Sequence, residues 1–153
     1  MRKTIITTLL ISIFLSGCFP NRLPDTYDFQ NKGCEIERIE LLHNPDWPYS
    51  RPLDEFIFLR ELEAEEFAPF MEAIYAIPTK LTITPPPTGY GEYVARVVYE
   101  NGDVELFGSW HIEFVEYGDS PSEIGEYVFS GDAIDDVFFE YVGKTEDGLR
   151  EPK

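Results

Sequence analysis

The chain has 153 residues, of which 43% are hydrophobic and 15% aromatic, so it is too apolar to be disordered and long enough for one domain with a single core. Its 29 acidic residues outnumber 12 basic residues, which gives a formal net charge of −17 at pH 7. A surface this acidic repels phosphate groups, which argues against nucleic acid and anionic lipid headgroups as partners and favours either solubility alone or a basic partner.

The first predicted element is a secretion signal. Arg2 and Lys3 stand before residues 4–14, an apolar run that contains neither acid nor base. The run is followed by Leu15, Ser16, Gly17 and Cys18. Residues 4–14 are too few to span a bilayer, which requires about 20 apolar residues, so a basic start and a short apolar core indicate a cleaved signal rather than a transmembrane helix.

These residues resemble the bacterial prolipoprotein signal peptide, whose pattern is Leu, a small residue, Gly or Ala, and then Cys. The resemblance implies that residues 1–17 are removed and that Cys18 becomes a lipidated first residue. Cleavage would remove Arg2 and Lys3 but no acid, so the net charge would change from −17 to −19. Two or three acyl chains anchor a protein firmly. The expected partner is therefore the lipid bilayer, reached through acylated Cys18.

The same resemblance implies a place in the bacterial cell envelope, on the outer face of the plasma membrane or, where the cell has two membranes, in the outer membrane. Phe19 follows the cysteine, whereas an Asp there signals inner-membrane retention in that family. The sequence leaves the type of cell wall and the oligomeric state open.

The remaining chain divides into three parts. Residues 18–33 hold the lipidated Cys and a flexible tether, because prolines, asparagines and a glycine interrupt any apolar period. Residues 34–144 form a single globular domain, and residues 145–153 form a polar tail. Lipidation of Cys18 would leave Cys34 without a disulfide partner, and we expect Cys34 to act as a small buried hydrophobe rather than a reactive thiol.

The domain is expected to begin with a strand over residues 35–43 and a proline-rich loop over residues 44–52. Trp47 and Tyr49 in this loop form a possible recognition surface, because such side chains often anchor interfaces. The alternative is that Trp47 folds back over the core. The continuous apolar run 56–59 predicts a strand covered on both faces.

A helix is predicted next, with one apolar face and an acidic first turn. The apolar positions are Phe67, Phe70, Met71, Ile74 and Tyr75. The first turn contains Glu63, Glu65 and Glu66, where the helix dipole favours negative charge. Pro69 restricts the start of the helix because proline is tolerated only in the first turn, and Pro78 ends it.

A short strand over 81–84 and a stiff connector at Pro85–Pro87 lead to a hairpin. Apolar and other residues alternate over 93–100, and Asn101 with Gly102 predicts a type I′ turn. The return strand, 104–115, carries Leu106 on its apolar face and Glu105 on a partly wet face, and Gly108 marks a bulge or bend.

A last strand over 126–130 precedes a helix capped by Asp132, which continues to Val142 and ends at Gly143. This order of elements predicts an α+β fold, in which an antiparallel sheet, a meander with a central hairpin, packs against two amphipathic helices that cover one face.

The only pair that suggests chemistry is His111 and Glu113, which lie two apart in a strand and share a face. A zinc site needs three or four ligands, and His43 is the only other histidine, so we expect no metal and no cofactor. We find no serine-nucleophile elbow, phosphate-binding loop or calcium loop. The 29 acidic residues offer so many possible pairs that their abundance gives no evidence for a glycosidase with two catalytic carboxylates.

These observations lead us to expect a membrane-anchored envelope lipoprotein with a small acidic, non-catalytic domain that binds another envelope protein or a wall component. The first alternative is an immunity or inhibitor lipoprotein that covers a basic toxin or hydrolase with its acidic surface. The second is an envelope enzyme, which would need a pocket that brings His111 or His43 together with carboxylates.

Overall fold

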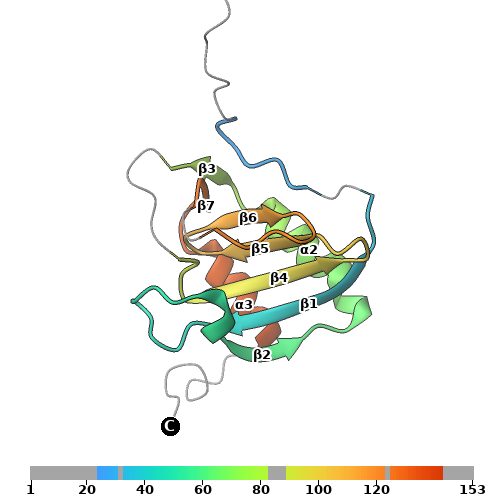
Figure 1. Ribbon diagram of the computed structural model, residues 1–153, viewed down its shortest axis with the longest axis horizontal. Helices are drawn as coiled ribbons and strands as arrows, with labels where there is room; N and C mark the ends of the chain where they lie inside the picture. Colours follow the sequence, from blue (N-terminus) through green and yellow to red (C-terminus); the bar gives the residue numbers. More distant parts are fainter. Residues whose placement is uncertain (1–23, 31–32, 83–88, 123–124, 143–153) are drawn as a thin grey trace, which may run out of the picture.

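The computed structural model describes residues 24–30, 33–82, 89–122 and 125–142. It shows the predicted α+β fold: one seven-stranded antiparallel sheet with two helices on one of its faces (Figure 1). We call this side of the sheet the helical face and the opposite side the open face. The proposed signal peptide, Cys18, Pro85–Pro87 and the polar tail lie outside the described residues.

The strands lie in the order β2-β1-β4-β5-β6-β7-β3. Their bounds are β1 Ile36–His43, β2 Ile57–Glu61, β3 Thr79–Leu81, β4 Tyr93–Tyr99, β5 Val104–Gly108, β6 Ile112–Val115 and β7 Tyr127–Phe129. The expected strands 35–43 and 126–130 are confirmed as β1 and β7, whereas the strand expected over 81–84 ends at Leu81. The four neighbouring strands β4 to β7 form the predicted meander.

The predicted hairpin is confirmed as β4 and β5, but its turn differs from the expected type I′ turn. The turn hydrogen bond runs from Gly102 N to Tyr99 O, so Glu100 and Asn101 are the central residues. Gly102 follows with a φ of 89°, a left-handed conformation that glycine adopts without a steric penalty. The connection is therefore a turn followed by a left-handed glycine, another common hairpin arrangement.

The return strand is two strands rather than one. β5 ends at Gly108 and β6 begins at Ile112, so the alternation predicted across 104–115 is broken. Glu105 and Phe107 of β5 point toward the helical face, where both are fully buried, and Leu106 is fully buried on the open face. The expectation that Glu105 lies on a partly wet face is wrong, because both faces of β5 are covered.

The expectation that residues 56–59 form a strand covered on both faces is also wrong. Among the described strands, β2 lies at the edge of the sheet and pairs only with β1, with an irregular register between Leu41 and Leu42. Ile57 and Phe58 are 42% and 55% exposed. A continuous apolar run is typical of a central strand, but here the strand lies at the edge of the sheet, where part of the run stays exposed.

Helix α2, Ala64–Ala76, begins at the acidic residues that were expected to form its first turn. Glu63 is its N-cap, and the side chain of Glu66 accepts a 2.8 Å hydrogen bond from Glu63 N to complete a capping box. Pro69 lies beyond the first turn, against expectation. Pro69 and Glu65, four residues earlier, are both exposed, so water can satisfy the carbonyl group that proline leaves unpaired.

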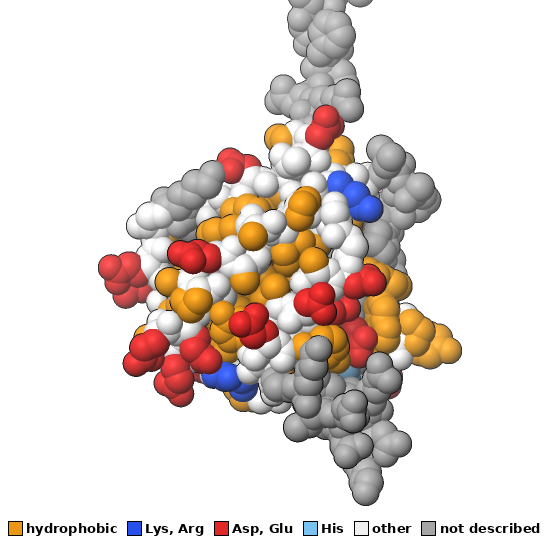
Figure 2. Space-filling view, turned by 180° about the vertical axis from the view of Figure 1, so that it is seen from behind, with side chains coloured by type: hydrophobic (Ala, Val, Ile, Leu, Met, Phe, Trp, Pro, Cys, Tyr) orange, Lys and Arg blue, Asp and Glu red, His pale blue; other side chains and the backbone are white. Residues whose placement is uncertain are grey.

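Helix α3, Ala133–Val142, confirms the last predicted helix. The main core lies between the sheet and the two helices. Its fully buried members include Ile39, Leu41, Phe70, Ile74, Ala95, Val97, Phe107, Ile134 and Phe138. Figure 2 shows the molecule from this side, with hydrophobic side chains gathered near the centre and carboxylates around them. Within the described part of the chain, neither helix is long and apolar enough to cross a membrane.

Residues 24–30, which we call the strap, were expected to belong to a flexible tether. They pack instead on the domain: Phe29 lies 4.6 Å from Tyr75 of α2 and 5.9 Å from Phe107 of β5, measured between ring centroids. The Tyr127 hydroxyl donates a 2.9 Å hydrogen bond to Pro24 O, and Leu81 N donates to Asp25 O. The strap therefore extends the helical-face layer beyond α2.

Candidate functional site

The open face carries a second, smaller core. Leu42, Val94, Leu106 and Val115 are its buried strand residues, and Tyr90 covers them from the segment before β4. Leu53 and Phe56 of the loop between β1 and β2 pack against its margin, where a short 3₁₀ helix, η1 (Leu53–Glu55), forms. Because two loops cover this face only in part, a concave surface remains between them.

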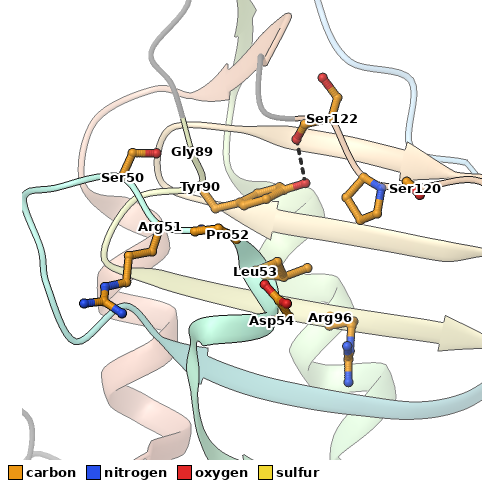
Figure 3. A pocket seen from close by; sticks show the side chains of 11 residues that line it. Ser50, Arg51, Pro52, Leu53, Asp54, Gly89, Tyr90, Arg96, Ser120 and Ser122 are labelled. Atoms are coloured by element: carbon orange, nitrogen blue, oxygen red, sulfur yellow. Dashed lines mark hydrogen bonds between the residues drawn. The ribbon is translucent and has the colours of Figure 1, made fainter.

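That surface is an open groove of about 760 Å³ (Figure 3). Residues 50–54 line one side, residues 120–122 line the other, and Tyr90 and Arg96 lie between them. The complete lining is Ser50, Arg51, Pro52, Leu53, Asp54, Gly89, Tyr90, Arg96, Ser120, Pro121 and Ser122. Four hydroxyl groups, two guanidinium groups and a carboxylate thus line the groove together with apolar side chains, a composition suited to hydrogen bonding with a polar ligand.

The arginines of the groove already have acidic partners. Arg96 of β4 pairs with Glu40 of β1, whose other oxygen accepts a 3.1 Å hydrogen bond from Arg38 Nε. Arg51 pairs with Asp46 and Glu55. The groove therefore carries both positive and negative charges. It is not a typical anion-binding site, because each guanidinium already pairs with a carboxylate.

Tyr90 connects the groove to the His111–Glu113 pair that the sequence singled out. It is only 3% exposed, and its hydroxyl lies 2.7 Å from Glu113 Oε2 and 3.1 Å from the Ser122 carbonyl. Ser122 N donates to the other Glu113 oxygen at 2.7 Å. Burial raises the pKa of the Tyr90 hydroxyl, and the Glu113 carboxylate raises it further, so Tyr90 stays a hydrogen-bond donor.

His111 stacks on Tyr90, with ring centroids 4.5 Å apart and planes 6° from parallel. It is 1% exposed, and its Nε2 lies 3.6 Å from Glu113 Oε2. Burial lowers the pKa of His111 from 6.5 to about 4, so the imidazole is neutral at neutral pH. His111 and Glu113 thus lie close together as predicted, but His111 precedes β6 and is not part of the strand, and the distance between them is longer than a hydrogen bond.

A second cavity, of about 320 Å³, lies beside this pair. It is lined by Tyr27, His111, Ile112, Glu113, Phe114, Ser122, Glu126 and Tyr127. His111 therefore does share a cavity with carboxylates, as the enzyme alternative requires. Among the described residues, no group of three or more His, Cys, Asp and Glu side chains could hold a metal ion.

The other residues considered from the sequence are separate from these cavities. His43, at the end of β1, is 9% exposed, and its Nε2 lies 3.7 Å from Glu92 Oε1. Burial lowers the pKa of His43, and Glu92 opposes this effect. Cys34 is half-buried and packs against the main core. Cys18 lies outside the described residues.

Trp47 and Tyr49 of the proposed recognition loop differ in exposure. Trp47 is half-buried and contacts Trp110, with ring centroids 4.5 Å apart, whereas Tyr49 is 75% exposed. Asn44, which is 2% exposed, holds the loop by donating a 2.8 Å hydrogen bond to Tyr49 O and accepting one from Asp46 N. Tyr49 is therefore the aromatic side chain of this loop that a partner can reach.

Sequence reasoning missed Tyr90, the residue that joins the groove to the smaller cavity. It stands between Gly89 and Gly91, so the local pattern indicates a turn and says nothing about burial. Tyr90 takes its place because Gly108 of β5 has no side chain: an added Cβ would lie 2.2 Å from Tyr90 O. The sequence signal that could have indicated this contact is a tyrosine between two glycines together with a glycine inside a later strand, where another backbone can approach closely.

Replacing Gly108 with alanine should therefore destabilise the protein by about 2–3 kcal/mol, because the new methyl group must displace the Tyr90 backbone. Urea unfolding would measure the change, and the ring resonances of Tyr90 and His111 would report loss of their stacking. Gly118→Ala is the matched control, since an added Cβ there meets nothing within 4 Å and only its φ of 94° opposes the change. Equal stability of Gly108→Ala and the wild type would contradict this account of Tyr90.

No protein-family model matches the chain, and comparisons with curated proteins and with solved structures found no match.

Proposed function

We propose that this protein is a lipid-anchored binding protein of the bacterial cell envelope, and that the open-face groove holds its ligand. The observation that carries the proposal is the groove itself: its volume of about 760 Å³ lies within the usual range of ligand sites, and polar groups from two loops converge on it. The anchor is Cys18, on the strength of the lipoprotein-like sequence at residues 15–18.

The distance between anchor and domain is short in this proposal. Only residues 19–23 separate Cys18 from Pro24, where the strap is held to the domain by Tyr127. The six Cα–Cα steps from Cys18 to Pro24 span at most about 22 Å when fully extended. The domain would therefore stay close to the bilayer, and its partner would be a protein or wall component of the same compartment.

Replacing Cys18 with alanine should abolish membrane attachment. We expect the wild type to lose residues 1–17, gain the mass of its lipid and sediment with membranes, while Cys18→Ala keeps no lipid and leaves the membrane fraction. Intact-mass spectrometry and membrane fractionation would measure both. Cys34→Ala is the control, because the other cysteine should be dispensable for attachment. If wild type and Cys18→Ala had the same mass and fractionation, the anchor would be rejected.

The groove can be tested separately by photo-crosslinking in cells. A photoreactive residue at Ser120 should give a defined crosslinked product. This product should be lost when Arg96→Glu is added, because the new carboxylate repels Glu40, the present partner of Arg96 at the groove floor. The same photoreactive residue at Glu72, exposed on α2, is the control. Identical products from positions 120 and 72, unaffected by Arg96→Glu, would count against the groove as the binding surface.

A second candidate, an inhibitor or immunity lipoprotein, is supported by the charge of the protein. The processed chain would carry a net charge of −19, and Figure 2 shows carboxylates around apolar side chains on the helical face. A basic partner would then associate quickly, at a rate that falls steeply with salt. An association rate independent of salt would remove this candidate.

A further inference from the structure

The strap lies along the outer edge of β3, which is an edge strand of the described sheet (Figure 1). Leu81 N donates a 3.1 Å hydrogen bond to Asp25 O, and Tyr27 N donates one of 2.9 Å to Thr79 Oγ1. The residue number therefore rises along the strap as it falls along β3, so the two segments are antiparallel. Only the first of these two bonds joins two backbones, and the strap is held at the edge without being a strand of the sheet.

One buried carboxylate, that of Glu105 in β5, holds the strap from the inside. Its Oε1 accepts hydrogen bonds from the Tyr27 hydroxyl and from Gln30 N, both at 2.9 Å. Its Oε2 accepts one of 2.7 Å from the hydroxyl of Tyr99, which belongs to β4, so this oxygen keeps its donor when the strap leaves. Tyr27 also lines the smaller cavity, so its departure lets water reach Oε1 from that cavity.

Most of the strap is exposed to solvent. Five of its seven residues are exposed, and only Tyr27 and Phe29 are half-buried. The rings of these two residues pack on Tyr127, Tyr75 and Phe107, which the helices and strands of the domain hold in place. Release would lose these contacts, but it would regain the hydration of a buried carboxylate and the conformational freedom of seven residues. The strap can therefore open locally while the domain stays folded.

We propose that the strap is a releasable section of the tether and sets how far the domain reaches from the membrane. The inference rests on the proposed lipid anchor at Cys18. With the strap docked, the chain spans at most about 22 Å from Cys18 to Pro24. Cys34 is the next described residue that packs against the main core. The sixteen Cα–Cα steps from Cys18 to Cys34 span at most about 58 Å, so release more than doubles the reach.

A partner shifts the equilibrium between the docked and released states only if it binds them differently. A wall component or protein that lies beyond the reach of the docked form meets this condition, because only the released form can bind it. Binding of such a partner at the open-face groove then keeps the strap off the domain. A partner at the bilayer surface leaves the strap docked, so the position of the partner decides the state of the strap.

Hydrogen exchange on the full chain tests whether the strap opens by itself, and this test does not depend on the anchor. The Tyr27 and Gln30 amides donate hydrogen bonds that exist only while the strap is docked. Relative to intrinsic rates, we expect them to exchange at least about a hundredfold faster than the amide of Val97, which is fully buried in β4, and with little dependence on urea. Equal protection of all three amides, with the same urea dependence, would overturn the proposal.

A reversible crosslink tests the change in reach. The contacts with β3 place Thr26 opposite Lys80, and both side chains are exposed. In a Cys34→Ala background, Thr26→Cys with Lys80→Cys should therefore form a disulfide that locks the strap. Glu105→Ala is added to release the strap, and the lipidated protein is bound to vesicles. Energy transfer from a dye on an unnatural residue at Glu72 to labelled lipid headgroups should then be high in the oxidised protein and fall after reduction.

The matched control carries Thr26→Ser with Lys80→Ser and cannot be locked, so its energy transfer should be low with and without reductant. Equal transfer before and after reduction, on a chain that is bound to the vesicles, would overturn the strap proposal and leave the anchor standing. A lipobox-dependent chain that fails to bind vesicles would instead overturn the proposed anchor, and the change in reach would fall with it.

Discussion

Replacing Glu105 with alanine should lower the free energy of unfolding by about 2–4 kcal/mol, because it removes the acceptor of three hydrogen bonds and leaves the buried Tyr99 hydroxyl without a partner. Glu105 is fully buried in β5 and accepts hydrogen bonds from the Tyr27 hydroxyl at 2.9 Å, Gln30 N at 2.9 Å and the Tyr99 hydroxyl at 2.7 Å. Two of these donors belong to the strap. The substitution should therefore also release the strap from the domain.

Urea unfolding would give the loss of stability, and hydrogen exchange at the Tyr27 and Gln30 amides would report release of the strap. Glu105→Gln is the closest control: it keeps one carbonyl oxygen for the strap donors and should cost only about 1 kcal/mol. Tyr27→Phe removes a single donor and should cost a similar amount. If the alanine and glutamine variants were equally stable, the hydrogen bonds of Glu105 would not be what holds the strap.

Acidification should remove about 2–3 kcal/mol of stability through His111 alone. Burial lowers the pKa of His111 from 6.5 to about 4, so between these values the unfolded chain binds a proton that the folded protein does not. Stability therefore falls as the pH decreases from 6.5 toward 4, and the contribution is complete above 6.5.

The measurement is the difference between wild type and His111→Phe in urea unfolding across this pH range. Phenylalanine keeps an aromatic ring against Tyr90 but cannot titrate. The comparison with His111→Phe is needed because other buried groups also make stability depend on pH. Burial raises the pKa of Glu105 and of Asp135, and a carboxyl group with a raised pKa lowers the stability of the protein as the pH rises, opposite to the effect of His111. Parallel pH profiles for the two proteins would show that His111 is not buried as a neutral base.

Local structure could be predicted where neighbouring residues decide it. The acidic start of α2, its apolar face and the hairpin of β4 and β5 all follow from periods and caps within a few residues. The candidate site could be predicted only in part. The closeness of His111 and Glu113 follows from their separation of two residues, but Tyr90, which stacks on His111, lies 21 residues earlier in a segment without a period.

The sequence by itself determined the class of elements, their order and the expectation of a lipid anchor at Cys18, because each depends on a short contiguous pattern. Only the tertiary structure decided that β2 is an edge strand, that both faces of β5 are covered and that the strap belongs to the domain. Alternation in a strand says which residues share a face, but not what will cover that face. Tyr27 and Glu105 are 78 residues apart, and no local pattern encodes the contact that buries a carboxylate beneath a strap.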